Sequence, residues 1–249
     1  MLFLPLALMA CSISVVPFIQ DPFVAAPQAY KREFENDWVR VVRVRYGPRE
    51  KIASHDHPRR GTVYIYLRNS GPVRFTHTGE EKFTLIRPAV KGGGFRLGRR
   101  LKVKETHEVE SLSEHSTEFL RVELKTLELD TQTFRGRFPP EPHPTDNSSQ
   151  KVRFENRQVR ILHVTCAARH KCEGTNPSTS PSLLVALTPS HFRRIVRDGT
   201  ASDLKIELGQ TFWLEANDQL HLENTGNVPA ELLKIELRTK PANNPEEGE

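Results

Sequence analysis

Short segments that alternate hydrophobic and polar residues recur along the whole chain, with glycine- or proline-containing turns between them. Residues 38–46 alternate valines with arginines, and residues 62–68 are β-branched and aromatic. Further candidate strands cover residues 73–76, 82–86, 100–104 and 119–125. No stretch keeps a helical period for three turns, although residues 191–197 also fit a short helix. About six to eight short strands per hundred residues predict an all-β fold of the jelly-roll or small-barrel type.

The two halves of the chain share a sequence pattern. The tripeptide Phe-Glu-Asn occupies residues 34–36 and again residues 154–156, an offset of 120 residues. At this offset residues 34–67 carry nine identities, where background composition would give about two. The remaining identical pairs are Val39/Val159, Arg40/Arg160, Val44/Val164, Arg49/Arg169, Lys51/Lys171 and Leu67/Leu187. Residues 120–125 and 233–238 also match as alternating strands, so we interpret the pattern as a duplication.

The duplication predicts two tandem barrels. Residues 131–150 are rich in Pro, Asp, Asn and Ser and have no hydrophobic period, which is typical of a linker. Residues 191–197 match a strand of the first copy, which favours a strand over a helix there. The predicted units are a targeting segment at residues 1–29, an N-terminal barrel at 30–128, a linker at 129–150, a degenerate C-terminal barrel at 151–240 and a disordered tail at 241–249.

Composition and charge narrow the classes of partner. The 249 residues are 37% hydrophobic and 27% charged, with a formal net charge of +5 at pH 7, which is ordinary for a globular protein. Lysines and arginines are scattered among glutamates, and neither an aromatic–basic motif nor a DNA-binding helix pair accompanies them. The sequence therefore argues against a nucleic-acid partner.

The N-terminus has the character of an export signal. Residues 1–20 carry no charge, and their first half is almost continuously apolar. Small residues that suit a peptidase follow at Ala25, Ala26 and Ala29. Residues 8–11 resemble a bacterial lipobox, which would make Cys11 a lipid anchor. We expect a periplasmic or extracellular protein, which a lipid on Cys11 would hold at the membrane. The alternative is that the apolar segment is a buried N-terminal strand.

Cys166 and Cys172 lie six residues apart in one segment. In an oxidising compartment they could close a small disulfide loop, and otherwise they would be two independent thiols. Their spacing is not a zinc signature, because no second CxxC or HxxxH pair accompanies it. The sequence leaves both states of the cysteines open.

Three histidines of the first copy are candidate metal ligands. His55 and His57 follow a loop at residues 47–54, and side chains at i and i+2 of an extended chain point to the same face. His107 lies in a segment that can return beside this pair in an antiparallel barrel. Three neutral imidazoles on one side of a cation leave positions open for water and substrate. The alternative is a surface loop that holds two solvated histidines.

With this histidine pattern, the chain resembles the cupin superfamily, and specifically its two-domain bicupins, over about residues 34–239. The family's first motif has a glycine, HxH and then a glutamate, and its second motif has a histidine followed closely by asparagine. The three histidines match the family's metal ligands, but Gly61 and Thr62 stand in the place of the glutamate. The resemblance implies two jelly-roll barrels and a three-histidine site for Fe, Mn or Zn, as in thiol-dioxygenase-like and some diketone-cleaving cupins. It argues against the four-ligand site of the oxalate enzymes.

Three further residues are candidates for an acid or base near the metal. Tyr64 and Tyr66 share the strand parity of the missing glutamate, so their phenols could donate hydrogen bonds or protons in the pocket. They could equally be aromatic residues that fill the barrel. Glu110 follows His107 closely and is the third candidate.

The second copy has lost most of this pattern. At the offset of 120 residues, His55 and His57 become Thr175 and Pro177, and only His221 remains from the second motif. Other histidines that could rebuild a site are His163, His170 and His191, but their spacing gives no reason to expect one. We expect the second barrel to be structural or to hold an apolar pocket.

Two functions remain open on the sequence alone. One is an enzyme in which the metal acts on a small organic molecule, by dioxygenase- or isomerase-like chemistry. The other is a non-catalytic module that binds a small ligand or mediates assembly, since one fold supports both. Exposed barrel faces should pair the first copy with the second, which gives a pseudo-symmetric monomer, with a homodimer as the alternative.

Overall fold

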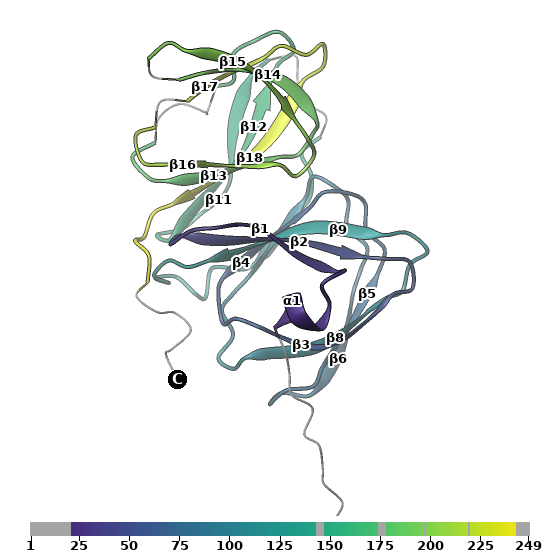
Figure 1. Cartoon of the computed structure of the whole chain (residues 1–249). Coiled ribbons are helices and arrows are strands. Elements are labelled where there is room, and N and C mark those ends of the chain that lie inside the picture. Colours follow the sequence, from purple (N-terminus) through teal and green to yellow (C-terminus); the bar gives the residue numbers. More distant parts are fainter. Residues whose placement is uncertain (1–20, 143–146, 174–177, 197, 219, 243–249) are drawn as a thin grey trace, which may run out of the picture.

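The computed structural model describes residues 21–142, 147–173, 178–196, 198–218 and 220–242. Their strands form two barrels that lie one above the other in Figure 1, which confirms the predicted all-β fold of two tandem jelly-roll barrels. One short helix, α1 (Pro22–Ala25), precedes the first strand. In the described part of the chain, no helix has the length and apolar character that crossing a membrane requires.

The first barrel consists of two antiparallel sheets. The larger sheet has the order β1 (Tyr30–Glu35), β2 (Val39–Tyr46), β9 (Thr117–Leu124), β4 (Thr62–Tyr66), β7 (Phe95–Gly98) and β10 (Gly136–Phe138). The smaller sheet has the order β3 (Lys51–His57), β8 (Glu105–Ser111), β5 (Val73–His77) and β6 (Phe83–Arg87). The candidate metal ligands therefore lie on the smaller sheet, which faces the larger one across the barrel.

The second barrel repeats this plan. Its larger sheet has the order β11 (Ser149–Glu155), β12 (Val159–Cys166), β18 (Ala230–Leu237), β13 (Ser182–Ala186) and β16 (Thr211–Leu214). Its smaller sheet has the order β15 (Ala201–Ile206), β14 (Ser190–Ile195) and β17 (His221–Asn224). The segment that fitted both a helix and a strand is thus the strand β14.

The repeated residues are those that shape the turns. Asn36 accepts hydrogen bonds from the backbone NH groups of residues 38 and 39, and Asn156 does the same for residues 158 and 159. Such asparagine turns set the hairpin between the first two strands of each copy. Arg49 and Arg169 both adopt a left-handed backbone, with φ of 52° and 63°. A β-bulge also recurs at the same place in the β1–β2 and β11–β12 pairs. The duplication therefore preserves backbone geometry.

Two predicted segments differ from the structure. Residues 100–104 are not a strand but the connection between β7 and β8. Leu101 is exposed there, and none of these five side chains is buried, although apolar and polar residues alternate. The segment predicted as a linker contributes β10, which pairs with β7, and buries Phe134 in the core. Phe134 and Phe138 are the only aromatic residues in the sequence of residues 131–150, and two isolated apolar side chains do not produce a strand period. The sequence pattern therefore did not reveal this strand.

The larger sheets of the two barrels pack face to face and share one hydrophobic core. In β2, Val39 and Val41 point into this shared core. Val42 and Val44 alternate with them and point into the interior of the first barrel. The shared core also contains Val63, Ile65, Leu120 and Val122 from the first barrel and Ile161, Leu183, Leu233 and Ile235 from the second. One face of each larger sheet is therefore buried against the other barrel.

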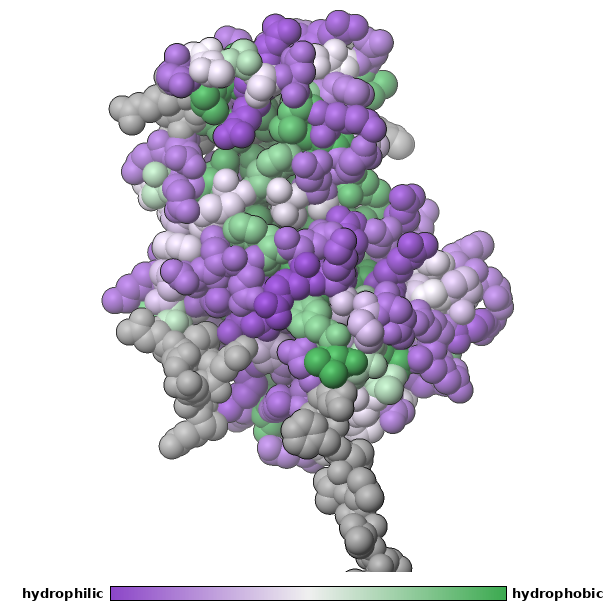
Figure 2. Space-filling view, in the orientation of Figure 1, coloured by the Kyte–Doolittle hydropathy of each residue, from purple (hydrophilic) through white to green (hydrophobic). Residues whose placement is uncertain are grey.

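Contacts at the rim also join the barrels. The ring of Trp213 packs on the ring of Phe34, with their centroids 6.1 Å apart. Arg43 reaches across and donates a hydrogen bond from Nη2 to the backbone oxygen of Gly209, at 3.1 Å. Hydrophilic residues cover most of the outer face that Figure 2 shows.

Candidate metal centre

His55, His57 and His107 converge inside the first barrel. His55 and His57 lie on β3, His107 lies on β8, and the two strands pair with His55 opposite His107. One nitrogen from each ring lies within 4.8 Å of the other two, and the ring centroids are 4.9 to 5.0 Å apart. All three side chains are buried. The predicted convergence of the three histidines is confirmed, and the alternative of a solvated loop is wrong.

The local backbone explains why both histidines of β3 point inward. Residues 55 and 57 share one parity of the strand, and the pairing with β8 puts His107 on the same face. A register irregularity between Ile52 and His55 interrupts the ladder just before the first histidine of the cluster. Such bulges re-aim side chains next to functional sites.

Several nitrogens of this cluster lack a partner. The Nδ1 atom of His55 lies 2.7 Å from the backbone oxygen of Ala53, so the Nδ1–H donates there and the lone pair of Nε2 is free. The described protein atoms offer no hydrogen bond to Nε2 of His55, Nδ1 of His57 or Nε2 of His107. Buried polar atoms without partners are rare, and a bound cation would satisfy them. The donor set therefore fits a divalent metal.

Burial also keeps the rings in the form that binds metals. Burial, and after it the neighbouring His107, lowers the pKa of His55 to about 4. Burial, together with the positive charge of Arg121, holds the pKa of His57 well below its usual value. Both rings are therefore neutral at pH 7, as ligation requires.

A carboxylate that the sequence reasoning missed lies beside the histidines. Glu105 is on β8, two residues before His107, and its Oε1 lies 3.3 Å from Nδ1 of that ring. Burial would raise the pKa of Glu105, but His107 and Arg121 outweigh this and hold it well below the usual range. His77, on β5 opposite His107, completes a second possible ligand group with Glu105 and His107. Strand alternation alone would have found Glu105, because it shares the parity of His107.

The residues in the place of the family's glutamate do not supply a ligand. Gly61 packs so that a Cβ atom would lie 3.3 Å from the ring of Phe134, and its NH donates to Glu128. Thr62 is buried, and its hydroxyl donates to the backbone oxygen of Arg60. In the structure, as in the sequence, no carboxylate occupies the position of the family's glutamate.

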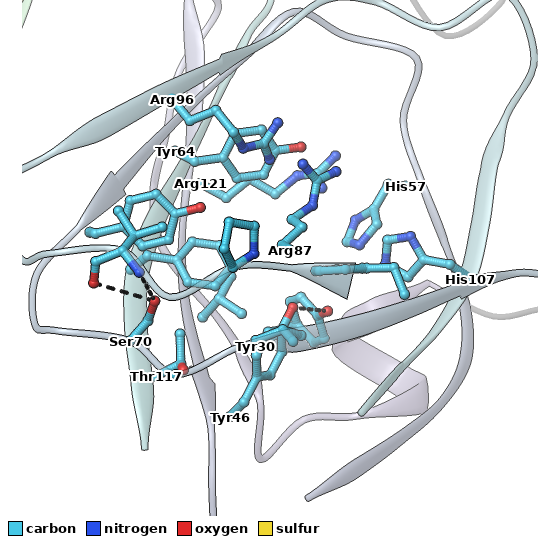
Figure 3. A pocket seen from close by; sticks show the side chains of 18 residues that line it. Tyr30, Tyr46, His57, Tyr64, Ser70, Arg87, Arg96, His107, Thr117 and Arg121 are labelled. Carbon is cyan, nitrogen blue, oxygen red and sulfur yellow. Dashed lines mark hydrogen bonds between the residues drawn. The ribbon is translucent and has the colours of Figure 1, made fainter. Parts of the chain in front are cut away.

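All four tyrosines of the chain line one cavity beside the histidines. The structure places Tyr64 and Tyr66 in its wall, and a catalytic role for either stays a prediction. Tyr30 packs on the ring of His55 with a centroid distance of 4.9 Å, and its hydroxyl lies 3.0 Å from that of Tyr46 (Figure 3). Burial raises the pKa of both Tyr30 and Tyr46, so these phenols stay protonated.

Glu110 does not belong to this cavity, and the expectation that it does is corrected. It lies three residues after His107, so it has the opposite parity on β8 and points out of the barrel. Its carboxylate forms ion pairs with Arg74 and Lys51 on the outer face of the sheet.

Apolar side chains occupy the interior of the second barrel. At the repeat offset, Tyr46, Tyr64 and Tyr66 become Cys166, Leu184 and Ala186, which all belong to a hydrophobic cluster. Within the described residues, both possible ligand groups lie in the first barrel. Of the four histidines in the second copy, His163 is hydrogen-bonded to Glu231 at 2.7 Å, and His170, His191 and His221 are exposed. Thr175 and Pro177 lie outside the described residues.

Cys166 and Cys172 form a disulfide, which decides between the two states that the sequence left open. Closing so short a loop stabilises a fold by about 2 kcal/mol through the entropy of the unfolded chain. We therefore expect dithiothreitol to lower the free energy of unfolding in urea by about this amount. The double variant Cys166→Ala/Cys172→Ala should not respond to the reductant. An equal response in both proteins would contradict the expectation.

Solved structures relate this fold to known proteins, whereas no protein-family profile and no curated protein matches the chain. A cupin 2 conserved barrel domain protein from Leptotrichia buccalis is 11% identical, with a TM-score of 0.51 over 84% of this chain and 88% of that one. YhaK from Escherichia coli is 11% identical, with a TM-score of 0.56 over 84% and 91%. Oxalate decarboxylase from Bacillus subtilis, studied for its Mn(II) centres, is 13% identical, with a TM-score of 0.53 over 86% and 77%. At these identities the likeness concerns the fold.

The chain therefore has the cupin fold, in its two-barrel bicupin form, over most of its length. Its first barrel contains a buried cluster of three histidines, and its second barrel does not repeat that cluster within the described residues.

Proposed function

We propose that the first barrel binds one divalent metal ion, Fe, Mn or Zn, through His55, His57 and His107, and acts on a small organic molecule there. The observation that carries this proposal is the set of buried imidazole nitrogens that face one another without partners. The Mn(II) centres of the structurally similar oxalate decarboxylase support it. Bound there, such a metal would supply Lewis-acid chemistry or, if it is iron, a site for oxygen.

The residues around the metal would hold and orient the molecule. Glu105 would fix the ring of His107 or serve as a fourth ligand, since its carboxylate is ionised and close. Tyr64 and Tyr66 present phenols to the same cavity, where they could donate hydrogen bonds. Within this proposal, we expect the reaction to be of the dioxygenase or isomerase type.

A non-catalytic ligand-binding module is the second candidate. The position of Glu110 on the outer face favours it, because that residue was one of three candidate acids or bases. Measurable turnover of any substrate by the metal-loaded protein would decide for the enzyme.

The test of metal binding is a thermal-shift series on metal-free protein with Mn(II), Fe(II), Zn(II) and Mg(II). A metal at about 100 times its Kd should stabilise the fold by about 2.7 kcal/mol. Nitrogen-rich sites prefer the transition metals, so Mg(II) should have little effect. The absence of a shift with all three transition metals would overturn the proposal.

We also propose that the protein works in the periplasm or outside the cell, with Cys11 as a lipid anchor where it is modified. Residues 1–20, including Cys11, lie outside the described residues. The Cys166–Cys172 disulfide supports export, because such bonds persist in oxidising compartments. The shared core of the two barrels supports a pseudo-symmetric monomer over a homodimer.

A further inference from the structure

A second cavity adjoins the one beside the histidines. We call the cavity that His57 and His107 line the inner cavity, with a volume of about 40 Å³, and its larger neighbour the outer chamber, with about 240 Å³. Tyr66, Arg87 and Arg96 belong to the walls of both. These three side chains therefore stand where the outer chamber meets the inner cavity.

Two arginines at this junction have no carboxylate partner among the described residues. Nε of both Arg87 and Arg96 is buried, and no described residue offers it a hydrogen bond. The guanidinium group of Arg87 lies 4.9 Å from the ring centroid of Phe75, and that of Arg96 lies 3.8 Å from the ring centroid of Tyr64. The Tyr64 and Tyr66 side chains also interact with the guanidinium group of Arg96. Arg121, in the same barrel, is different because its Nε donates to Glu123 at 2.9 Å. In Figure 3 the side chains of Arg87 and Arg96 project toward the same part of the cavity.

The outer chamber adds further positive charge. Lys91 and Arg137 line it and are exposed to solvent. Among the described residues of its wall, none is an aspartate or glutamate. A concave site of one charge sign concentrates ligands of the opposite sign. The chamber therefore favours an anion.

The remaining wall of the outer chamber is apolar and partly aromatic. The rings of Phe95 and Phe138 stack with centroids 4.5 Å apart and planes 8° apart, and Pro139 and Pro140 continue this surface. Such a wall suits a planar hydrocarbon body. The inner cavity has room for about three water-sized groups, which fits a carboxylate better than a larger anion.

The second barrel holds this wall in place. Arg153, at β11, donates a hydrogen bond from Nη2 to the backbone oxygen of Pro139, at 2.8 Å. The same guanidinium forms an ion pair with Glu141 at 2.8 Å and lies 5.8 Å from the ring centroid of Phe95. The barrel without the histidine cluster thus positions part of the binding site of the other.

We propose that the ligand of the first barrel is a small organic acid with a planar apolar body. Its carboxylate binds Arg87 and Arg96 at the junction, facing the histidines, and its body lies against Phe138 in the outer chamber. Guanidinium groups suit this role because their paired NH donors match the two oxygens of a carboxylate. The inference deepens the proposed function, because it names the class of molecule that the site binds. Recognition of the acid by the two arginines does not require the proposed metal.

The test uses benzoate and its neutral isostere benzamide, titrated by calorimetry into the full chain. We expect benzoate to bind at least tenfold more tightly than benzamide. The variants Arg87→Gln and Arg96→Gln should each weaken benzoate binding about tenfold and leave benzamide unchanged. Arg193→Gln, at a half-exposed arginine of β14 in the other barrel, is the matched control and should bind benzoate like the natural protein.

Equal affinities of the natural protein for benzoate and benzamide would overturn the proposal, and this comparison does not depend on how any variant folds. The titration is repeated after removal of metal with EDTA and after reloading with Mn(II). Selective benzoate binding that persists without metal supports the proposal, even if the protein proves to hold no metal. Selectivity that appears only with Mn(II) would assign recognition to the metal and overturn it.

Discussion

Replacing His57 by alanine should lower the affinity of the protein for its metal by at least about 100-fold. Removal of groups that merely orient a ligand already costs 10- to 100-fold, and His57 would be a direct ligand. Two imidazoles would remain, and neither Gly61 nor Thr62 could replace the third. Plasma emission spectrometry on dialysed protein should find about one ion per natural chain and a small fraction of that in the variant.

The matched control is His163→Ala. His163 is a buried histidine at the second copy's β12, where it pairs with Glu231. Its loss should leave the metal content unchanged, although it removes a buried hydrogen bond. Equal metal content in the His57 variant, the His163 variant and the natural protein would show that the metal, if any, is bound elsewhere.

The substitution Ile235→Ala should lower the free energy of unfolding by about 2 to 5 kcal/mol. Ile235 is fully buried on β18, in the core that the two larger sheets share. The neighbouring strands cannot close the resulting cavity without shifting one barrel against the other. Urea denaturation followed by far-ultraviolet circular dichroism measures the change.

Ile86→Ala makes the same chemical change at an exposed site. Ile86 is 55% exposed on the edge strand β6, so its loss should cost less than about 1 kcal/mol. If the two substitutions destabilise the protein equally, the interface between the larger sheets does not contribute to stability as we describe.

The sequence predicted the scaffold and the histidine cluster because both follow from simple rules of spacing. The repeat at an offset of 120 residues implied two barrels, and the structure shows that its identities preserve turns such as those at Asn36 and Arg49. The parity of extended chains placed His55 and His57 on one face. Applied to Glu110, the same parity would have excluded that residue.

Other parts of the pocket could not be predicted in this way. Arg96 lies on β7, an alternating strand whose polar side chains would usually face solvent. Here the apolar parity of the larger sheet is buried against the other barrel, so polar side chains such as Arg96 and Arg121 face the barrel interior. The packing of one copy on the other therefore reverses the usual rule that the polar side chains of a strand face solvent. The strand β10 escaped notice because three residues are too short for a period.

The filled interior of the second barrel has a consequence for how this chain tolerates mutation. Buried charges such as Arg121, and buried imidazole nitrogens without partners such as Nδ1 of His57, make the first barrel costly to fold. The second barrel, with its hydrophobic interior and its disulfide, offsets this cost through the core that both share. One copy thus holds the polar site and the other supplies stability, whereas a single-barrel protein must meet both demands within one core. Loss of the histidine pattern in the second copy therefore stabilises the fold that holds the histidine cluster of the first.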